Sequence, residues 1–556
     1  MIKQFLFLNL LLFSAGSVQA QLVNNGASIV IESGAKLLVE GDVTNNGTIT
    51  NNGELEIQGD LNNDDQITSN NGSKIIFSGS GNSIIYSANP LSFVELVLNK
   101  ANGATTTVDA VDGNDIAMIG KVRFLDNNFL VLSDHDLSLA NIASPIESAG
   151  TDRYIATGGE GKVIHPALGT FSSFTYPIGA STGEYNPITV TNNAAPAVIG
   201  ARSLAEAYTI ADDSNSGPAG DAVKASWQVT GGTDLDIEVN WVAGDQPASY
   251  DPDISGVARW DDVNNFWDLT IDDGLGLTGT SATRSDVSPG YFAVGGESVM
   301  DFILILPKVI LSGAYNSGSG TMRTDLAAST LIPGGEPYEG LGFTHKGLGG
   351  GETSADFTGV VDWVFVEIRD GNDPTRIIGT CSALLKSNGD IVPTSSASDL
   401  KMPGFDSSKS YYVAIHHRNH LAVMSDNPIS ASRNSTVSYD LINNDVYGTN
   451  GAQFSNSVYQ LWGGDFNNDG VVSYDGGAEP GRTALFNYIT GHIDNLSGSP
   501  TFTKNEYSVF DVDLDGNSSY DGGSNPGRTN LFNIIVNHPN NASGSPTYTF
   551  SNLLPK

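Results

Sequence analysis

Near its C-terminal end the sequence contains a tandem duplication, and this feature limits the possible fold more than any other. Residues 464–477 (GDFNNDGVVSYDGG) align with residues 510–523 (FDVDLDGNSSYDGG), 46 positions further on. The alignment continues through the strings PGRT and LFN, which begin at Pro480 and Leu485 in the first copy and at Pro526 and Leu531 in the second. The duplication predicts two copies of one structural unit within residues 441–556.

Both copies carry oxygen-bearing side chains at loop positions 1, 3, 5 and 9, with a glycine, Gly470 or Gly516, at position 6. This is the spacing of the first part of an EF-hand loop, in which six to eight oxygen atoms bind calcium at about 2.3–2.6 Å. The glycine permits the turn that brings the position-7 carbonyl onto the ion. Asparagine-glycine and aspartate-glycine turns that happen to repeat are the alternative. The predicted calcium ligands are Asp465, Asn467, Asp469, the carbonyl of Val471 and Ser473, then Asp511, Asp513, Asp515, the carbonyl of Asn517 and Ser519.

The last ligand of each loop departs from the EF-hand pattern. An EF-hand has an acid at position 12, whereas Asp475 and Asp521 stand at position 11 and are followed by glycine. The closing ligand is therefore either Asp475 or Asp521 itself, or a group that reaches back from Glu479 in the first copy, whose counterpart is Asn525.

Each loop is followed by a predicted helix. Pro480 and Pro526 suit a first helical turn, and an apolar face follows in each copy. A calcium loop plus one helix, twice, resembles a dockerin-type module. The resemblance implies two halves that pack antiparallel and a helix face that binds a partner module on a scaffold. The insert at residues 476–481 departs from that family's pattern. The apolar faces consist of Leu485, Phe486 and Ile489, and of Leu531, Phe532 and Ile535.

Shorter repeats follow the N-terminus. Residues 36–47 align with residues 54–65, 18 positions on, and residues 74–79 follow after another 20. Each unit has a short apolar strand that ends at glycine and an asparagine-rich turn. Stacked units bury the apolar side chains that a single unit would leave exposed. We predict a β-solenoid over residues 21–145, with a meander of hairpins as the alternative.

Two further regions show the alternating pattern of half-buried strands. They cover residues 146–300 and 301–440, and turn-forming residues separate their strands. We predict a β-sandwich-like domain in each. The expected fold is thus mainly β: a β-solenoid, two sandwich-like domains and a small dockerin-like calcium-loop-helix pair.

The region before the duplication resembles a family of haemagglutinin-like bacterial extracellular or surface proteins. In that family a β-domain stands just before paired dockerin-like repeats, and membership implies secretion and adhesion rather than a defined catalytic activity. The resemblance covers roughly residues 300–556. It rests on the motifs at residues 311–315, 322–326, 337–343, 361–369, 382–385, 388–391 and 411–424.

Charge limits the possible partners. The sequence has 62 acidic and 26 basic residues, which gives a net charge of -36. Nucleic acid is an improbable partner for such a chain, and so is an anionic lipid surface. Divalent cations and neutral surfaces such as glycans remain compatible. No segment is long and apolar enough for a membrane span.

The first twenty residues have the pattern of an export signal. Lys3 supplies the positive region, residues 5–13 the apolar stretch and Val18-Gln19-Ala20 a cleavage site. We expect the mature chain to begin at Gln21 and to be extracellular or on the cell surface.

Patterns that would support catalysis or other binding sites are weak. The string from Gly179 to Gly183 matches a nucleophile elbow but leads into another strand pattern. His417 and His420 have a usable metal spacing, but packing and hydrogen bonding at a strand end is the favoured interpretation for them and for His416. Trp260 and Trp267 are the better candidates for an exposed sugar-stacking platform.

The sequence therefore predicts a secreted or surface adhesin that binds a glycan or a protein, without catalysis. Calcium is the expected cofactor. The alternatives are an extracellular polysaccharide-degrading enzyme, since short β-solenoids occur in lyases, and a docking subunit that binds a scaffold protein through its C-terminal module.

Overall fold

The computed structural model describes residues 20–109, 115–270, 273–346, 350–395, 399–432, 436–478 and 480–555. The predicted signal peptide, apart from its last residue, and Glu479 lie outside the described residues. The described chain divides into two compact units. The first contains the residues up to Trp267 together with Gly276–Val299, and the second contains Asp268–Leu275 together with the residues from Met300 onward.

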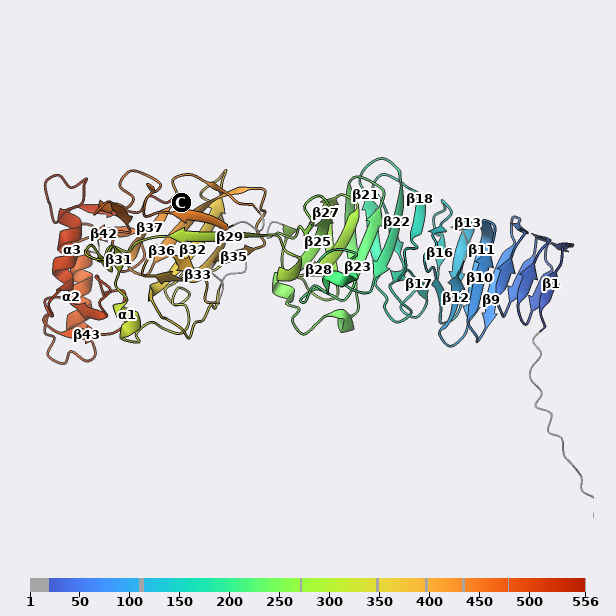
Figure 1. Ribbon diagram of the computed structural model, residues 1–556, viewed down its shortest axis with the longest axis horizontal. Coiled ribbons are helices and arrows are strands. Elements are labelled where there is room, and N and C mark those ends of the chain that lie inside the picture. The colour runs from blue at the N-terminus through green and yellow to red at the C-terminus, as the bar shows by residue number, and fades with distance from the viewer. Residues whose placement is uncertain are drawn as a thin grey trace, which may run out of the picture. The chain divides into compact units, whose positions relative to one another are not determined.

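The first unit begins with a β-solenoid of about seven turns (Figure 1). Strands of successive turns pair in parallel, for example Leu37 with Leu55 and Leu55 with Ile75. Hairpins would pair in antiparallel, so the prediction of a solenoid is confirmed and the meander is excluded. One face consists of β1 (Leu22–Asn24), β4 (Val43–Asn45), β7 (Leu61–Asn63), β10 (Ser83–Ser87), β12 (Ala104–Val108), β14 (Asn128–Val131), β17 (Tyr154–Ala156) and β20 (Ile178–Gly179). A short second face consists of β2 (Ser28–Ile31), β5 (Thr48–Asn51) and β8 (Gln66–Ser69).

The repeated asparagines stack inside the solenoid. The Asn24 side chain donates to Asn45 at 2.8 Å, Asn45 donates to Asn63 at 2.7 Å and Asn63 donates to the Ser87 hydroxyl at 3.0 Å. These four residues are buried, and each amide finds its partner in the next turn. The ladder satisfies polar groups that would otherwise destabilise the interior.

The third face of the solenoid continues into an antiparallel sheet. Strand β18 (Val163–Leu168) pairs in parallel with the solenoid and in antiparallel with β22 (Ala197–Leu204). The predicted boundary between residues 145 and 146 therefore falls inside one continuous sheet and one apolar core. The other strands are β3 (Lys36–Val39), β6 (Glu54–Ile57), β9 (Lys74–Gly79), β11 (Leu91–Lys100), β13 (Ile116–Phe124), β15 (Leu137–Ser138), β16 (Ile146–Glu147), β23 (Ser226–Thr230), β25 (Gly256–Asp261), β26 (Phe266–Trp267) and β28 (Gly290–Gly295).

A second antiparallel sheet completes the first unit. It has the order β19 (Ser172–Tyr176), β21 (Ile188–Asn192), β24 (Leu235–Asn240) and β27 (Ser281–Val287). Buried Trp227 and Trp241 belong to the same core as the solenoid residues.

The second unit contains a β-domain, the name used here for residues 301–440. Its larger sheet consists of β34 (Ile391–Val392), β33 (Ile377–Lys386), β32 (Val360–Asp370), β36 (Ser410–His417), β37 (His420–Met424) and β38 (Ile429–Ser430). The smaller sheet consists of β35 (Leu400–Pro403), β29 (Phe302–Lys308) and β39 (Thr436–Asp440). Strands β30 (Tyr315–Asn316) and β31 (Thr321–Met322) form a separate hairpin, and α1 (Asp325–Ala328) contacts β32 of the larger sheet. Trp363 is fully buried in the core of this domain.

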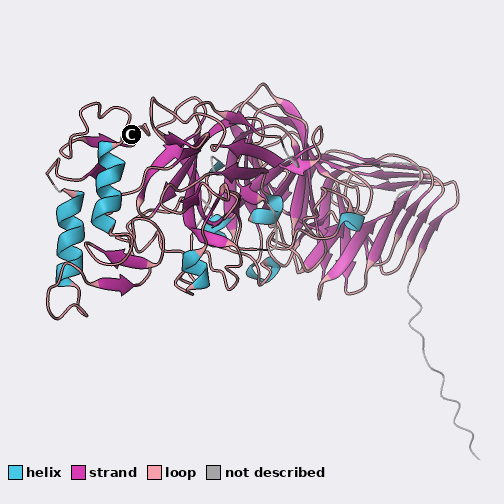
Figure 2. Cartoon of the chain, turned by 60° about the vertical axis from the view of Figure 1, so that its left-hand side comes forward, coloured by secondary structure: helices cyan, strands magenta, loops and turns pink. Residues whose placement is uncertain are grey.

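The duplicated residues form a loop-helix pair, the name used here for residues 464–551. Helices α2 (Gly481–Gly491) and α3 (Gly527–Val536) contact each other and stand out as the two longest helices in Figure 2. The two copies exchange strands. β42 (Val471–Ser473) of the first loop pairs with β45 (Thr549–Ser551), which follows α3, and β43 (Thr503–Asn505), which follows α2, pairs with β44 (Asn517–Ser519) of the second loop. The hairpin of β40 (Gln453–Ser455) and β41 (Val458–Gln460) precedes the pair.

Candidate metal centres

The two predicted calcium loops have the same backbone construction. Loop 1 denotes residues 465–475 and loop 2 residues 511–521. In each, the carboxylate of position 1 accepts a hydrogen bond from the N–H of the position-6 glycine, at 3.1 Å from Gly470 to Asp465 and at 2.9 Å from Gly516 to Asp511. Gly470 and Gly516 have φ values of 78° and 85°, where glycine is favoured. The turn therefore folds back over the first acid in both copies.

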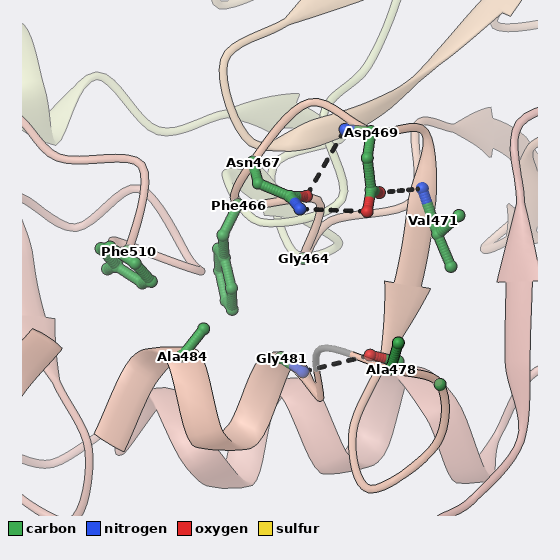
Figure 3. A pocket seen from close by; sticks show the side chains of 11 residues that line it. Gly464, Phe466, Asn467, Asp469, Val471, Ala478, Gly481, Ala484 and Phe510 are labelled. Atoms are coloured by element: carbon green, nitrogen blue, oxygen red, sulfur yellow. Dashed lines mark hydrogen bonds between the residues drawn. The ribbon is translucent and has the colours of Figure 1, made fainter. Parts of the chain in front are cut away.

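In loop 1 the polar groups of positions 3 and 5 lie together. Figure 3 shows Asn467 and Asp469 facing each other beside Val471, where the Asn467 amide donates to Asp469 at 3.0 Å and the Val471 N–H donates to Asp469 at 2.8 Å. They border a hollow of about 460 Å³ whose floor includes Ala484 of α2. The loop thus presents its oxygen atoms toward an accessible space.

In loop 2 three carboxylates converge. One oxygen atom from each of Asp511, Asp513 and Asp515 lies within 4.8 Å of the other two. The Asn517 N–H donates to Asp515 at 2.8 Å, which repeats the contact between Val471 and Asp469 in loop 1. Oxygen atoms this close repel one another unless a cation or protons lie among them.

Burial makes these carboxylates difficult to ionise without a counter-ion. Burial and then the neighbouring Asp469 raise the pKa of Asp465 to about 7. In loop 2, burial raises the pKa of Asp511 to about 7 although Arg418 opposes the shift, and burial and then Asp515 raise the pKa of Asp513 to about 6. A divalent cation would remove this penalty, since it favours the charged form of every carboxylate around it.

One buried atom in loop 1 is particularly informative. Asp465 is 4% exposed, and within the described part of the chain its Oδ1 atom has no hydrogen-bond partner. A buried carboxylate oxygen without a partner costs free energy. The donor set around it consists of carboxylate, amide and carbonyl oxygens, which are the ligands that calcium prefers. The residues present in both loops fit such an ion.

The position-11 acids point to the helices. Asp475 forms an ion pair with Arg482 at 2.5 Å, and Asp521 forms the equivalent pair with Arg528 at 2.7 Å. In loop 2, the Asn525 side chain lies close enough to Asp513 to favour the charged form of that carboxyl group. Asp521 is thus engaged by Arg528, whereas Asn525, 14 places after the first acid, faces a predicted ligand of loop 2.

The position-9 serines contact the start of each helix. The Ser473 hydroxyl accepts from the Gly481 N–H at 3.1 Å, and Ser519 accepts from Gly527 at 3.4 Å. A Cβ atom at Gly481 or Gly527 would lie 2.5 Å from the carbonyl oxygen of the same serine. Glycine at the first helical position lets the loop lie directly against the helix.

The histidine pair lies fully buried between the β-domain and loop 2. The two Nδ1 atoms of His417 and His420 are 3.1 Å apart, and His417 Nε2 is 3.1 Å from Asp362. Burial lowers the pKa of both imidazoles, most strongly that of His420. His416, by contrast, pairs with Glu367 at 3.1 Å.

The tryptophans favoured as a sugar platform are not exposed, so that expectation is wrong. Trp260 and Trp267 are 4% and 2% exposed and pack edge to face, with ring centroids 5.4 Å apart. The Trp267 indole N–H donates to the Tyr208 carbonyl at 2.9 Å. A loop distant in sequence covers the hairpin that carries both rings, which the alternation within that hairpin does not reveal.

Sequence reasoning missed three residues that hold loop 2. Arg418 donates to the Ser508 carbonyl, Asn419 donates to the Asp511 carbonyl at 2.7 Å and Arg323 donates to the Asp513 carbonyl. All three belong to the β-domain. The only signal near them was the polar string at residues 416–420, which interrupts an otherwise apolar hairpin.

No protein-family model, curated protein or solved structure matches this chain. Among the described residues, none of the helices has both the length and the apolar character needed to cross a membrane.

Proposed function

We propose that the chain is a secreted or cell-surface adhesin whose C-terminal loop-helix pair binds two calcium ions, and that it is not an enzyme. The observation that carries the calcium sites is the buried Asp465 carboxylate with its unpartnered oxygen, together with the three converging carboxylates of loop 2. The ligands would be the two predicted sets, and Asn525 is the candidate closing group in loop 2. Calcium would neutralise carboxylates whose pKa values burial raises.

Adhesion has support of a different kind. The resemblance of residues 300–556 to haemagglutinin-like surface proteins, the predicted export signal and the net charge of -36 agree with binding to neutral glycans or to proteins outside the cell. Because the solenoid and the sheets supply long, regular surfaces, their loops are the expected contact points.

Calorimetry with calcium tests the metal sites. The mature chain, residues 21–556, is the sample, because the contacts of loop 2 with the β-domain would be lost in a shorter fragment. We expect two bound ions, one of which disappears in Asp465→Asn and the other in Asp511→Asn. Absence of any calcium-dependent heat would remove the metal sites from the proposal.

Cell binding tests adhesion separately. The labelled mature chain is incubated with erythrocytes in calcium and in chelator, beside the two Asp→Asn variants. Binding that disappears in chelator and in the variants supports an adhesin that depends on calcium. Binding that is the same in all samples would assign adhesion to the β-sheets alone.

Docking to a scaffold protein is a second candidate, favoured by one surface feature. Ile493 and Leu496, which follow α2, are 85% and 96% exposed. The equivalent positions of the second copy are Pro539 and Ala542. An exposed apolar pair present in only one copy suits a partner that binds at one end of the loop-helix pair. Pull-down from the producing cell with the double variant Ile493→Asp/Leu496→Asp, and with Ala542→Asp as its control, tests this function.

A further inference from the structure

One buried residue of the β-domain contacts the first residue of both calcium loops. Asn419 lies in the turn between β36 and β37 and is completely buried. Its side-chain amide donates to the carbonyl of Asp511 at 2.7 Å and to that of Val509 at 3.0 Å. Position 1 of loop 2 is therefore fixed to this turn by its own backbone.

The same residue holds loop 1 through its main chain. The Asn419 carbonyl accepts from the N–H of Gly464 at 2.9 Å and from that of Asp465 at 3.2 Å. Asp465 and Asp511 are equivalent ligands in the two loops. Asn419 thus joins the two position-1 residues through one buried side chain and one carbonyl group.

A hydrogen-bond chain fixes the orientation of the Asn419 amide. The Gly313 N–H donates to His420 Nε2 at 3.2 Å, so the proton of a neutral His420 is on Nδ1. His420 Nδ1 lies 2.8 Å from the Asn419 Oδ1 atom and donates to it. The amide oxygen therefore faces His420, and the NH₂ group faces loop 2.

The turn belongs to one buried hydrogen-bonded network. Arg418 donates to Asp362 at 2.9 Å and lies over the Tyr507 ring, 4.3 Å from its centroid. The Tyr507 hydroxyl donates to the same carboxylate at 2.7 Å. Asp362, His417, Arg418 and His420 are all buried. Residues joined in such a buried network move together as one unit, and contiguous hydrogen-bonded groups of this kind carry coupling between sites.

We propose that Asn419 couples the two calcium loops, so that the ions bind with positive cooperativity. This inference rests on the proposed function. An ion that fixes the backbone of one position-1 residue also fixes Asn419, and the second loop then loses less conformational freedom when it binds its ion. Coupling between sites in proteins is typically about 5- to 150-fold and is reciprocal.

Calcium calorimetry on the mature chain measures this coupling without any change at Asn419. Asp465→Asn leaves only loop 2 and Asp511→Asn leaves only loop 1, so each variant gives one intrinsic affinity. We expect the product of the two affinities of the unmodified chain to exceed the product of these intrinsic values by about tenfold. Equal products would overturn the coupling while leaving two calcium sites in place, and no binding at all would overturn the proposed function as well.

Asn419→Ala then locates the coupling. The variant removes the amide that reaches Asp511 but keeps the carbonyl that reaches Asp465. In the Asn419→Ala chain, the product of the two calcium affinities should equal the product of the two intrinsic affinities, so that their ratio falls to about one. The intrinsic affinities are measured again after adding Asp465→Asn or Asp511→Asn to Asn419→Ala. The matched control is Asn427→Ala. Asn427 is exposed and lies three residues after Met424, the last residue of β37. This variant should keep the tenfold ratio. A folded Asn419→Ala chain, shown by an unchanged circular dichroism spectrum, that retains the full ratio would refute the role of this residue.

Discussion

Loop 1 and loop 2 share a sequence pattern and a backbone turn, yet their contacts with the β-domain differ. The β-domain side chains Arg323, Arg418 and Asn419 donate to backbone carbonyls in or beside loop 2. Loop 1 contacts this domain through the N–H groups of Gly464 and Asp465. Asn467 and Asp469 of loop 1 are exposed, whereas Asp513 and Asp515 of loop 2 are partly buried.

The loops also differ in charge. Position 3 is the neutral Asn467 in loop 1 and the acidic Asp513 in loop 2. Calcium affinity depends on the number of charged ligands and on the rigidity of the site. Both factors favour loop 2. A duplicated motif can thus keep its own spacing while its two copies acquire different neighbours, and we expect loop 2 to bind calcium more tightly than loop 1.

Calcium removal should have the largest effect. At a free calcium concentration of 100 times Kd, each ion adds about 2.7 kcal/mol to the folded state, so chelator should remove about 5 kcal/mol from the second unit. Differential scanning calorimetry of the mature chain measures the loss, with the transition of the solenoid unit as the internal control. Chelator should still remove more stability from Asp465→Ala, which keeps loop 2, than from Asp511→Ala, which keeps loop 1. The reverse order would mean that loop 1 binds calcium more tightly than loop 2.

Arg418→Met should have the next largest effect. The substitution keeps the volume of the side chain but leaves the buried Asp362 carboxylate without its guanidinium, which typically costs about 3–5 kcal/mol. Calcium affinity should fall mainly at loop 2, measured by calorimetry in the Asp465→Asn background for loop 2 and in the Asp511→Asn background for loop 1. The matched control is Arg482→Met, which breaks the more exposed pair with Asp475 and should cost less than about 1 kcal/mol. Equal losses at the two loops would contradict a selective hold on loop 2.

The sequence was most informative where the signal is local and periodic. The solenoid was predictable because 18- and 20-residue repeats place equivalent apolar residues and asparagines one turn apart. The loop pattern is local as well, since Gly470 donates to Asp465 and Asn467 donates to Asp469 within a single turn. Calcium binding at these positions stays a prediction. The antiparallel continuation of the solenoid sheet had no such period and was not predicted.

Contacts between distant residues were outside the reach of the sequence. The sequence did not reveal that Asp475, a predicted calcium ligand, forms an ion pair with Arg482 of α2. Asn419 precedes Asp511 by 92 positions. Its polar neighbours suggested hydrogen bonding at a strand end, but only the folded chain brings both calcium loops to that turn.

Acidification should destabilise the buried turn that supports loop 2. Burial lowers the folded-state pKa of His417 and His420 below the ordinary imidazole value of about 6.5. The unfolded chain then binds more protons below pH 6.5, so stability falls as pH decreases. Each imidazole that stays neutral in the folded chain contributes a loss of up to about 1.4 kcal/mol per pH unit between pH 6.5 and 5.5. Chemical denaturation at both pH values measures it. His417→Gln should reduce the slope, and an unchanged slope would show that these imidazoles do not control it.

The smallest expected effect comes from exchanging the charge at position 3. Asn467→Asp gives loop 1 the three acids of loop 2, and Asp513→Asn gives loop 2 the composition of loop 1. If ligand charge sets affinity, each change should alter the affinity of its own loop by about tenfold, upward in loop 1 and downward in loop 2. Calorimetry measures each loop alone, with Asp511→Asn or Asp465→Asn as the background.

Because the contacts of Arg323 and Asn419 are made to backbone carbonyls, both substitutions leave those hydrogen-bond partners in place. Loop 2 should therefore still bind more tightly than unmodified loop 1 when both carry asparagine at position 3. Equal affinities in that state would mean that charge alone separates the two sites and that the β-domain does not contribute.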